Sequence, residues 1–82
     1  MYVIRKLKTK LYLHEHCEQG YVAGFSELNL NTTERFDDFE DAKRFCLLLK
    51  KNSSIDTAID ELNLNFRYLW DSLDVNINSG EQ

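Results

Sequence analysis

The sequence predicts an α+β fold in which an N-terminal three-stranded antiparallel sheet is followed by two or three helices. Three observations lead to this prediction. Short runs rich in β-formers, separated by polar breaks, occupy residues 2–30. A run with 3.6-residue apolar spacing and charged ends covers 38–51. A second series of apolar residues, spaced by four and three, continues from 55 to 73.

The composition is that of one small globular domain, residues 1–82, with a thin core. The chain is 43% hydrophobic and 12% aromatic, which separates it from disordered sequences. No apolar run approaches the roughly 20 residues that span a membrane, and the N-terminus resembles a strand, so we expect a cytoplasmic protein. Cys17 and Cys46 form no CxxC pair and are expected to be free thiols. A disulfide between them is the alternative for a secreted protein.

Three strands are predicted in the N-terminal part. Residues 2–7 and 11–13 are rich in β-formers and are separated by a polar break, which predicts a hairpin. Residues 21–25 form the third predicted strand, and alternation of Leu28 and Leu30 with asparagines allows it to continue.

The strongest local pattern predicts a helix over 38–51. Asp37 with Glu40 three residues later resembles a capping box with aspartate as the cap. Acidic residues in the first turn and two lysines in the last turn both favour the helix dipole. Asn52 is expected to take the left-handed position that ends the helix.

Residues 54–73 are predicted to be one long helix or two helices that share an apolar face. Asparagines in the segment 63–65 favour a break between two helices. A strand interpretation of 64–77 competes, because apolar and polar residues also alternate there. We favour the helices because the 3.6-residue pattern runs longer than the alternation.

The pentapeptide Glu-Leu-Asn-Leu-Asn occurs twice, at 27–31 and at 61–65. Outside the pentapeptide the two surrounding segments agree poorly, and two units are too few for a solenoid, so we do not infer a repeat. The first copy is expected to end a strand and the second to close a helix.

Motifs for catalysis are lacking, and the sequence predicts a non-enzyme without cofactors. It contains no GxGxxG, GxxxxGK[ST], HExxH or GxSxG pattern. His14 and His16 would share one face of a strand, next to Cys17, at a spacing that can hold a metal. Because no second ligand pair accompanies them, we interpret them as a polar strand end rather than a metal site.

The net charge is −4, and the charges come in blocks. Residues 1–13 carry four cations and no acid, whereas 14–41 carry eight acids and one arginine. We expect a negative surface that docks on a basic groove of a host protein, one that itself binds nucleic acid. The alternative is an ordinary, well-capped helix start. The acidic residues in question are Glu34, Asp37, Asp38, Glu40 and Asp41.

A different hypothesis comes from the stretch SIDTAIDELNLNFRYLWDSL, residues 54–73. It resembles the helix-turn-helix of small DNA-binding regulators, with Asn63 where the family has a turn glycine and Ile59 at its small-residue position. The resemblance implies a recognition helix over 66–73. We do not expect direct nucleic-acid binding, because acids in and around that helix repel phosphates.

A third hypothesis is a structural homodimer built on the apolar seam from Ile55 to Leu73. Tyr68 and Trp70 would then be the interface anchors.

In its small size, its acidity and its lack of catalytic motifs, the chain also resembles small phage-encoded accessory proteins. Among these are inhibitors of bacterial defence such as anti-CRISPR proteins. The stretches that carry this resemblance are MYVIRK at 1–6 and FDDFEDAKRF at 36–45. It implies a non-enzymatic inhibitor that binds a protein in the host cytoplasm and makes no contact with a membrane.

Overall fold

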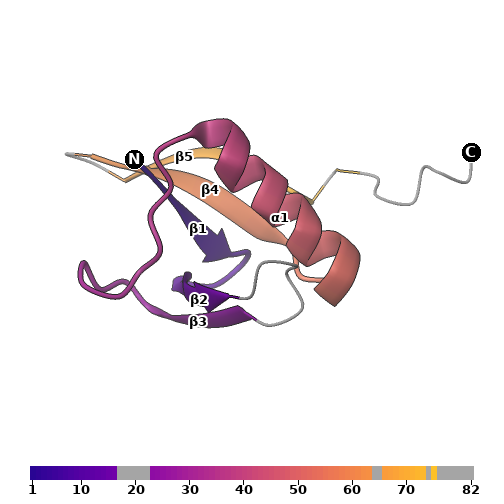
Figure 1. The fold of residues 1–82 in the computed structure, drawn as a ribbon, viewed down its shortest axis with the longest axis horizontal. Coiled ribbons are helices and arrows are strands. Elements are labelled where there is room, and N and C mark those ends of the chain that lie inside the picture. Colours follow the sequence, from indigo (N-terminus) through magenta and orange to yellow (C-terminus); the bar gives the residue numbers. More distant parts are fainter. Residues whose placement is uncertain (17–22, 64–65, 74, 76–82) are drawn as a thin grey trace, which may run out of the picture.

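The structure is a computed structural model that describes residues 1–16, 23–63, 66–73 and 75. Within these residues the chain forms a five-stranded antiparallel sheet with one helix packed on one of its faces (Figure 1). The elements, in chain order, are β1 (Tyr2–Lys6), β2 (Leu11–His16), β3 (Ala23–Glu27), α1 (Phe39–Ser53), β4 (Thr57–Leu62) and β5 (Phe66–Asp71).

The first strand lies at the centre of the sheet. The strand order is β3-β2-β1-β4-β5, so β1 joins an N-terminal meander to a C-terminal hairpin. The β1–β4 ladder runs in unbroken register from Tyr2↔Glu61 to Lys6↔Thr57. Irregularities interrupt the two outer ladders, one at Leu13/Glu15 and one at Ile59/Asp60. Each of these two outer ladders thus contains one bulge or irregularity, whereas the β1–β4 ladder contains none.

One face of the sheet packs against α1 and forms the core. Ile4, Leu13 and Ile59 come from three adjacent strands and have no exposed surface. They contact the apolar stripe of α1, whose members are Ala42, Phe45, Cys46 and Leu49. Fully burying each large aliphatic side chain contributes about 1.5–3 kcal/mol, so these few contacts dominate the stability of so small a domain.

The helix predicted over 38–51 is confirmed, and its ends differ slightly from the prediction. The N-cap is Asp38 rather than Asp37, and its carboxylate accepts a hydrogen bond of 3.2 Å from the backbone N–H of Glu40. At the other end the left-handed residue is Ser54 (φ 56°) rather than Asn52. Its backbone N–H closes the last turn by donating to the carbonyls of Leu49 and Lys50. The predicted N-cap was one residue too early and the predicted left-handed residue two residues too early. Both errors arise because the chain offers several adjacent residues that can cap a helix.

The prediction of two or three helices after a three-stranded sheet is wrong. Residues 57–62 and 66–71 are strands, which leaves α1 as the one helix among the described residues. Four successive residues of β4, Thr57 to Asp60, are all buried. The helix α1 covers one side of this strand, and side chains of the neighbouring strands, Arg5 and Tyr12 among them, lie over Asp60 on the other. A strand buried on both faces loses its alternation in the sequence, so the apolar spacing there imitated a helix.

The hairpin also overturns two hypotheses about residues 54–73. A helix-turn-helix needs two helices where the structure has β4 and β5, and the apolar seam from Ile55 to Leu73 does not form one surface. Ile59 lies in the core, whereas Phe66 and Leu73 are exposed. The second copy of the repeated pentapeptide starts at the end of β4, just as the first starts at the end of β3. The expectation that it closes a helix is therefore wrong.

Among the described residues, no helix combines the length and the apolar character that crossing a membrane requires. The buried Cys46 in α1 is a free thiol. Burial raises its pKa to about 12, so at neutral pH it is a neutral packing residue and not a nucleophile.

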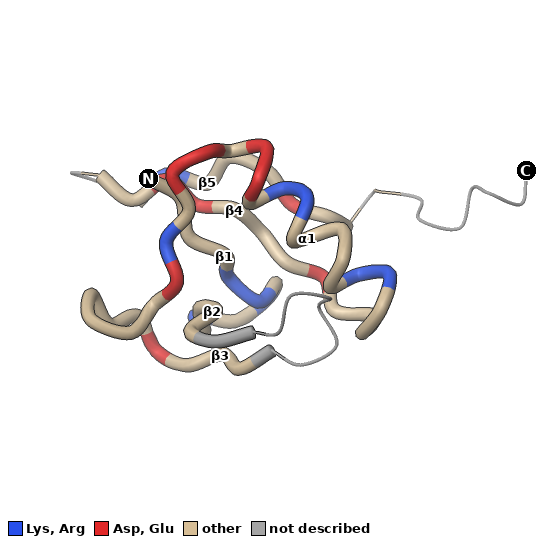
Figure 2. Tube along the Cα trace, in the orientation of Figure 1, with Lys and Arg blue, Asp and Glu red and all other residues tan. Residues whose placement is uncertain are grey.

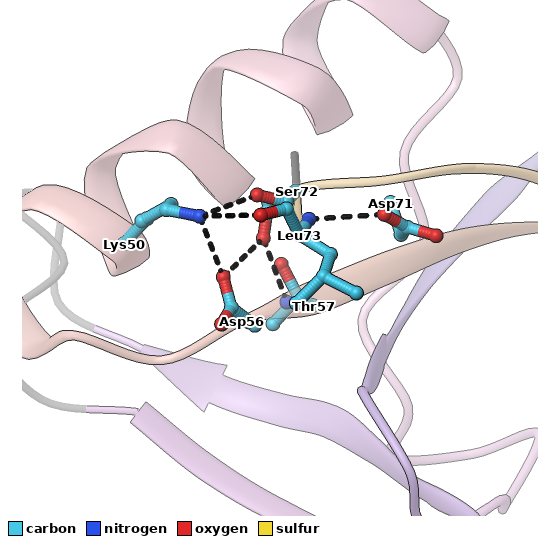
Figure 3. A network of polar contacts seen from close by, with 6 residues as sticks. All are labelled: Lys50, Asp56, Thr57, Asp71, Ser72 and Leu73. Atoms are coloured by element: carbon cyan, nitrogen blue, oxygen red, sulfur yellow. Dashed lines mark hydrogen bonds and ion pairs between the residues drawn. The ribbon is translucent and has the colours of Figure 1, made fainter. Parts of the chain in front are cut away.

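A polar network ties the end of α1 to both strands of the hairpin (Figure 3). The Lys50 ammonium donates to the Asp56 carboxylate at 2.9 Å and to the backbone carbonyls of Ser72 and Leu73. The Ser72 hydroxyl bridges the two strands, since it donates to Asp56 at 3.1 Å and accepts from the backbone N–H of Thr57 at 3.0 Å. We call these five residues the Lys50 network.

Replacing Lys50 by methionine is expected to lower the free energy of unfolding by about 1–3 kcal/mol, because it removes the ion pair with Asp56 and the hydrogen bonds to the carbonyls of Ser72 and Leu73. Urea unfolding followed by circular dichroism measures the change. Lys51→Met is the matched control, since Lys51 is exposed and loses only a helix-dipole interaction of at most about 1 kcal/mol. Equal losses in the two variants would contradict a specific role for Lys50.

Candidate functional site

The predicted acidic residues gather where the chain enters α1. We call Glu34, Asp37, Asp38, Glu40 and Asp41 the acidic end of α1, and in Figure 2 most of them form a nearly continuous stretch at the start of the helix. Except for Glu34, which is half-buried, they are exposed.

The segment that leads into the acidic end of α1 is anchored to the sheet. Phe36 forms a bridge with Tyr2, in which each backbone N–H donates to the other residue's carbonyl at 2.8 Å. The backbone N–H of Glu34 donates to the carbonyl of Leu13, also at 2.8 Å. These bonds fix the backbone that presents the carboxylates, so the negative surface is held in place by the central strands.

Two of the acidic residues have structural tasks. Asp38 caps the helix, and Asp41 forms an ion pair of 3.0 Å with Arg44 one turn later. Both members of that pair are more than half exposed, so it contributes little to stability. A partner can therefore reach Asp37 and Glu40 without disturbing the cap or this ion pair.

An apolar groove lies beside the acidic end of α1. Its volume is about 420 Å³. The stacked rings of Phe36 and Phe45, with centroids 6.3 Å apart, form part of its lining together with Leu48. Asp41 and Arg44 complete the lining. The place thus combines exposed carboxylates with a small apolar recess.

The two residues proposed as interface anchors lie on opposite faces of β5. Trp70 packs against the core, with the Lys43 ammonium 5.7 Å from its ring centroid. Tyr68 faces away from α1 and is 56% exposed. Because Leu69 is the extra residue of the bulge opposite Ile59 and Asp60, the two aromatic residues do not share a face. Neither of them lines the groove that Phe36, Phe45 and Leu48 form beside the acidic end of α1.

The face of the sheet turned away from α1 carries functional groups that the sequence did not reveal. It is defined by alternation from the core residues and is called the uncovered face. Its members include Val3, Arg5, Tyr12, Ala58, Asp60, Phe66, Tyr68 and Asp71. The sequence carried one sign of a positive surface here, since residues 1–13 contain four cations and no acid. It did not show which side chains meet on this face, because that depends on the strand order.

A buried carboxylate organises the uncovered face. Asp60 accepts from Arg5 Nε at 2.9 Å and from Nη2 at 3.4 Å, and from the Tyr12 hydroxyl at 3.2 Å. The hydrogen bond to Asp60 raises the pKa of the Arg5 guanidinium. Burial, helped by the Asp60 charge, raises the pKa of the Tyr12 phenol. The charge of Asp60 is thus compensated inside the protein.

The histidines and cysteine that could have held a metal lie partly outside the described residues. Cys17 and the side chain of His16 lie outside the described residues. Within the described part of the chain, no three residues of the His, Cys, Asp or Glu types gather in a way that could hold a metal ion.

Asp71 gives the uncovered face a pH-dependent contact. The Tyr68 hydroxyl and the backbone N–H of Leu73 donate to its carboxylate, and both bonds lower the pKa of Asp71 below its ordinary value of 3.8. Since the folded-state pKa is the lower one, this stabilisation is present above about pH 4 and is lost as the pH falls through the folded-state value.

An NMR titration of the Asp71 carboxyl is expected to give a midpoint below 3.8, the ordinary value for aspartate. Tyr68→Phe removes one of the two hydrogen bonds and should raise that midpoint, while leaving the bond from Leu73 intact. An unchanged midpoint in this variant would show that the tyrosine does not contact the carboxylate in solution.

Comparison with known proteins supplies no relative from which a role can be transferred. No family model, no curated protein and no solved structure matches the chain.

Proposed function

We propose that this protein is a small non-enzymatic binding module that docks the acidic end of α1 on a basic surface of another protein. One observation carries the proposal. Asp37 and Glu40 are exposed on an anchored backbone, next to an apolar groove that can receive a side chain. Interfaces of this kind combine charge complementarity with a buried apolar anchor.

The charge balance near the groove supports a basic partner. Residues 34–41 carry five carboxylates and one arginine. The positive end of the helix dipole, equivalent to about half an elementary charge, offsets only a small part of this. A negative surface of this kind accelerates encounter with a positive one and discriminates against acidic partners.

The groove adds a requirement on the shape of the partner. Phe36, Phe45 and Leu48 offer apolar contact, and desolvated apolar pockets are where binding energy concentrates in interfaces. The expected partner surface therefore has lysine or arginine residues around one projecting aliphatic or aromatic side chain.

A basic groove that normally holds nucleic acid has this character, and a protein that occupies it acts as a competitive inhibitor. An anti-defence role in the host cytoplasm, as in small phage-encoded proteins, is one instance of this proposal. The helix-turn-helix alternative is not retained, because it lacks its helices.

The test compares two charge-matched double variants. Asp37→Asn with Glu40→Gln removes two carboxylates and preserves the Asp38 cap and the Asp41–Arg44 pair. Each exposed charge contact contributes about 0.2–1 kcal/mol, so affinity for a captured basic partner should fall roughly 2- to 30-fold. Glu27→Gln with Asp71→Asn removes the same charge from the edge strand β3 and from the end of β5 that lies away from the start of α1, and should leave affinity nearly unchanged.

Affinity capture from a host lysate, followed by titration of the captured protein against each variant, provides the measurement. Binding should also weaken between 50 and 500 mM salt as the charges are screened. Equal losses in both double variants, or binding insensitive to salt, would refute docking through the acidic end of α1. Leu48→Gln tests the groove separately, because it changes no charge.

A further inference from the structure

The uncovered face holds a second groove, on the side of the sheet opposite α1. Its volume is about 740 Å³, within the range of about 300–1,000 Å³ typical of ligand sites. The β1–β2 connection forms one wall with Lys8 and Lys10, and Phe66 of β5 forms another. Tyr12 and Arg5 also line the groove.

Aromatic rings are exposed at this groove. Phe66 is 48% exposed and stacks on Tyr12, with ring centroids 5.9 Å apart and planes inclined by 27°. Tyr12 is only 9% exposed, so it supports Phe66 from the protein side. Tyr68, two residues along β5, is 56% exposed on the same face. A large ring held in place by another ring and still half exposed is a platform on which a planar group can stack.

The charge of the groove is positive, although the protein as a whole is acidic. The carboxylates of Asp60 and Asp71 lie on this face, but Asp60 is buried against Arg5 and Asp71 accepts a hydrogen bond from Tyr68. Lys8 and Lys10 are exposed, and Glu27 is the one acidic residue that lines the groove. The acidic end of α1 lies in the helical layer on the other side of the sheet.

We propose that this groove binds a short single-stranded nucleic acid. A base stacks on Phe66, with Tyr68 as a second platform, and the adjoining phosphates contact Lys8 and Lys10. Stacking platforms beside a positive groove are the means by which proteins hold unpaired strands without reading their sequence. A duplex does not fit this arrangement, because its base faces are already stacked.

This inference is independent of the proposed protein-binding function, since it uses the opposite side of the sheet. It also replaces the prediction from the sequence that the protein does not bind nucleic acid directly. That expectation rested on a recognition helix over 66–73 bearing acids, whereas in the structure these residues form β5 and its end.

The test is fluorescence anisotropy of a labelled ten-nucleotide oligo(dT), titrated with the protein at 20 mM salt. Loss of a stacked base is expected to lower affinity about 5- to 150-fold in Phe66→Ala. Phe66→Leu keeps an apolar side chain over Tyr12 and should show a similar loss with an unchanged thermal midpoint. With two phosphates neutralised, the logarithm of the association constant should fall with the logarithm of the salt concentration with a slope of about −1.4.

Lys8→Gln with Lys10→Gln should abolish most of that salt dependence, whereas Arg35→Gln with Lys51→Gln, a pair of exposed cations elsewhere, should preserve it. A poly-glutamate peptide of equal charge serves as the competing probe. No binding of oligo(dT) at 20 mM salt would overturn the proposal. Equal binding of poly-glutamate would overturn it too, because the groove would then recognise acidic peptides as well. Equal effects of the Lys8/Lys10 and Arg35/Lys51 double variants would also overturn it, because they would mean a general attraction of anions to the protein.

Discussion

A single helix buries a single face of the sheet, and the rest of the structure depends on this. Ile4, Leu13 and Ile59 bring three strands under the apolar stripe of α1, and their burial supplies most of the free energy that a domain of this size can gather. Because there is no second helix among the described residues to cover the other face, that face must protect itself. It does so with side chains that are long, aromatic or charged in compensated pairs. The uncovered face and its groove are thus a consequence of how the core is built.

Polar networks hold β4 from both sides. On the uncovered face, Asp60 connects β4 to Arg5 of β1 and to Tyr12 of β2. At the start of the strand, Asp56 and Thr57 join the end of α1 to the residue after β5 through Lys50 and Ser72. A buried carboxylate such as Asp60 is costly unless it is hydrogen-bonded, so its network disfavours alternative pairings as well as stabilising the native one. The hairpin is therefore specified by polar contacts on top of apolar burial.

The parts of this fold that could be predicted from the sequence are those whose signals are local. The helix has caps, end charges and apolar spacing within one window, so its position was predicted to within two residues at each end. The strand character of 57–62 was hidden, because a strand buried on both faces shows no alternation. Ala58, Ile59 and Leu62 also fall at helical spacing, although in the strand Ala58 and Ile59 face opposite sides of the sheet. Asn63 was correctly taken as a break, but it ends a strand and not a helix. The acidic end of α1 was predicted because its residues are contiguous. The groove on the uncovered face could not be, since Lys8, Tyr12 and Phe66 meet only once the strand order is known.

The central position of β1 has a consequence for how the chain is made. During synthesis β1 can pair with β2 almost at once, but its other edge waits for β4, which ends at residue 62. At about 5–20 residues per second, that edge stays unpaired for roughly 3–11 s. Its backbone groups and Ile4 are exposed to other nascent chains during this interval. Arg5 and Lys6 place two positive charges at the end of this open edge, and charges on an edge disfavour pairing with another chain. Asp60, which neutralises Arg5 in the folded protein, is made only with β4.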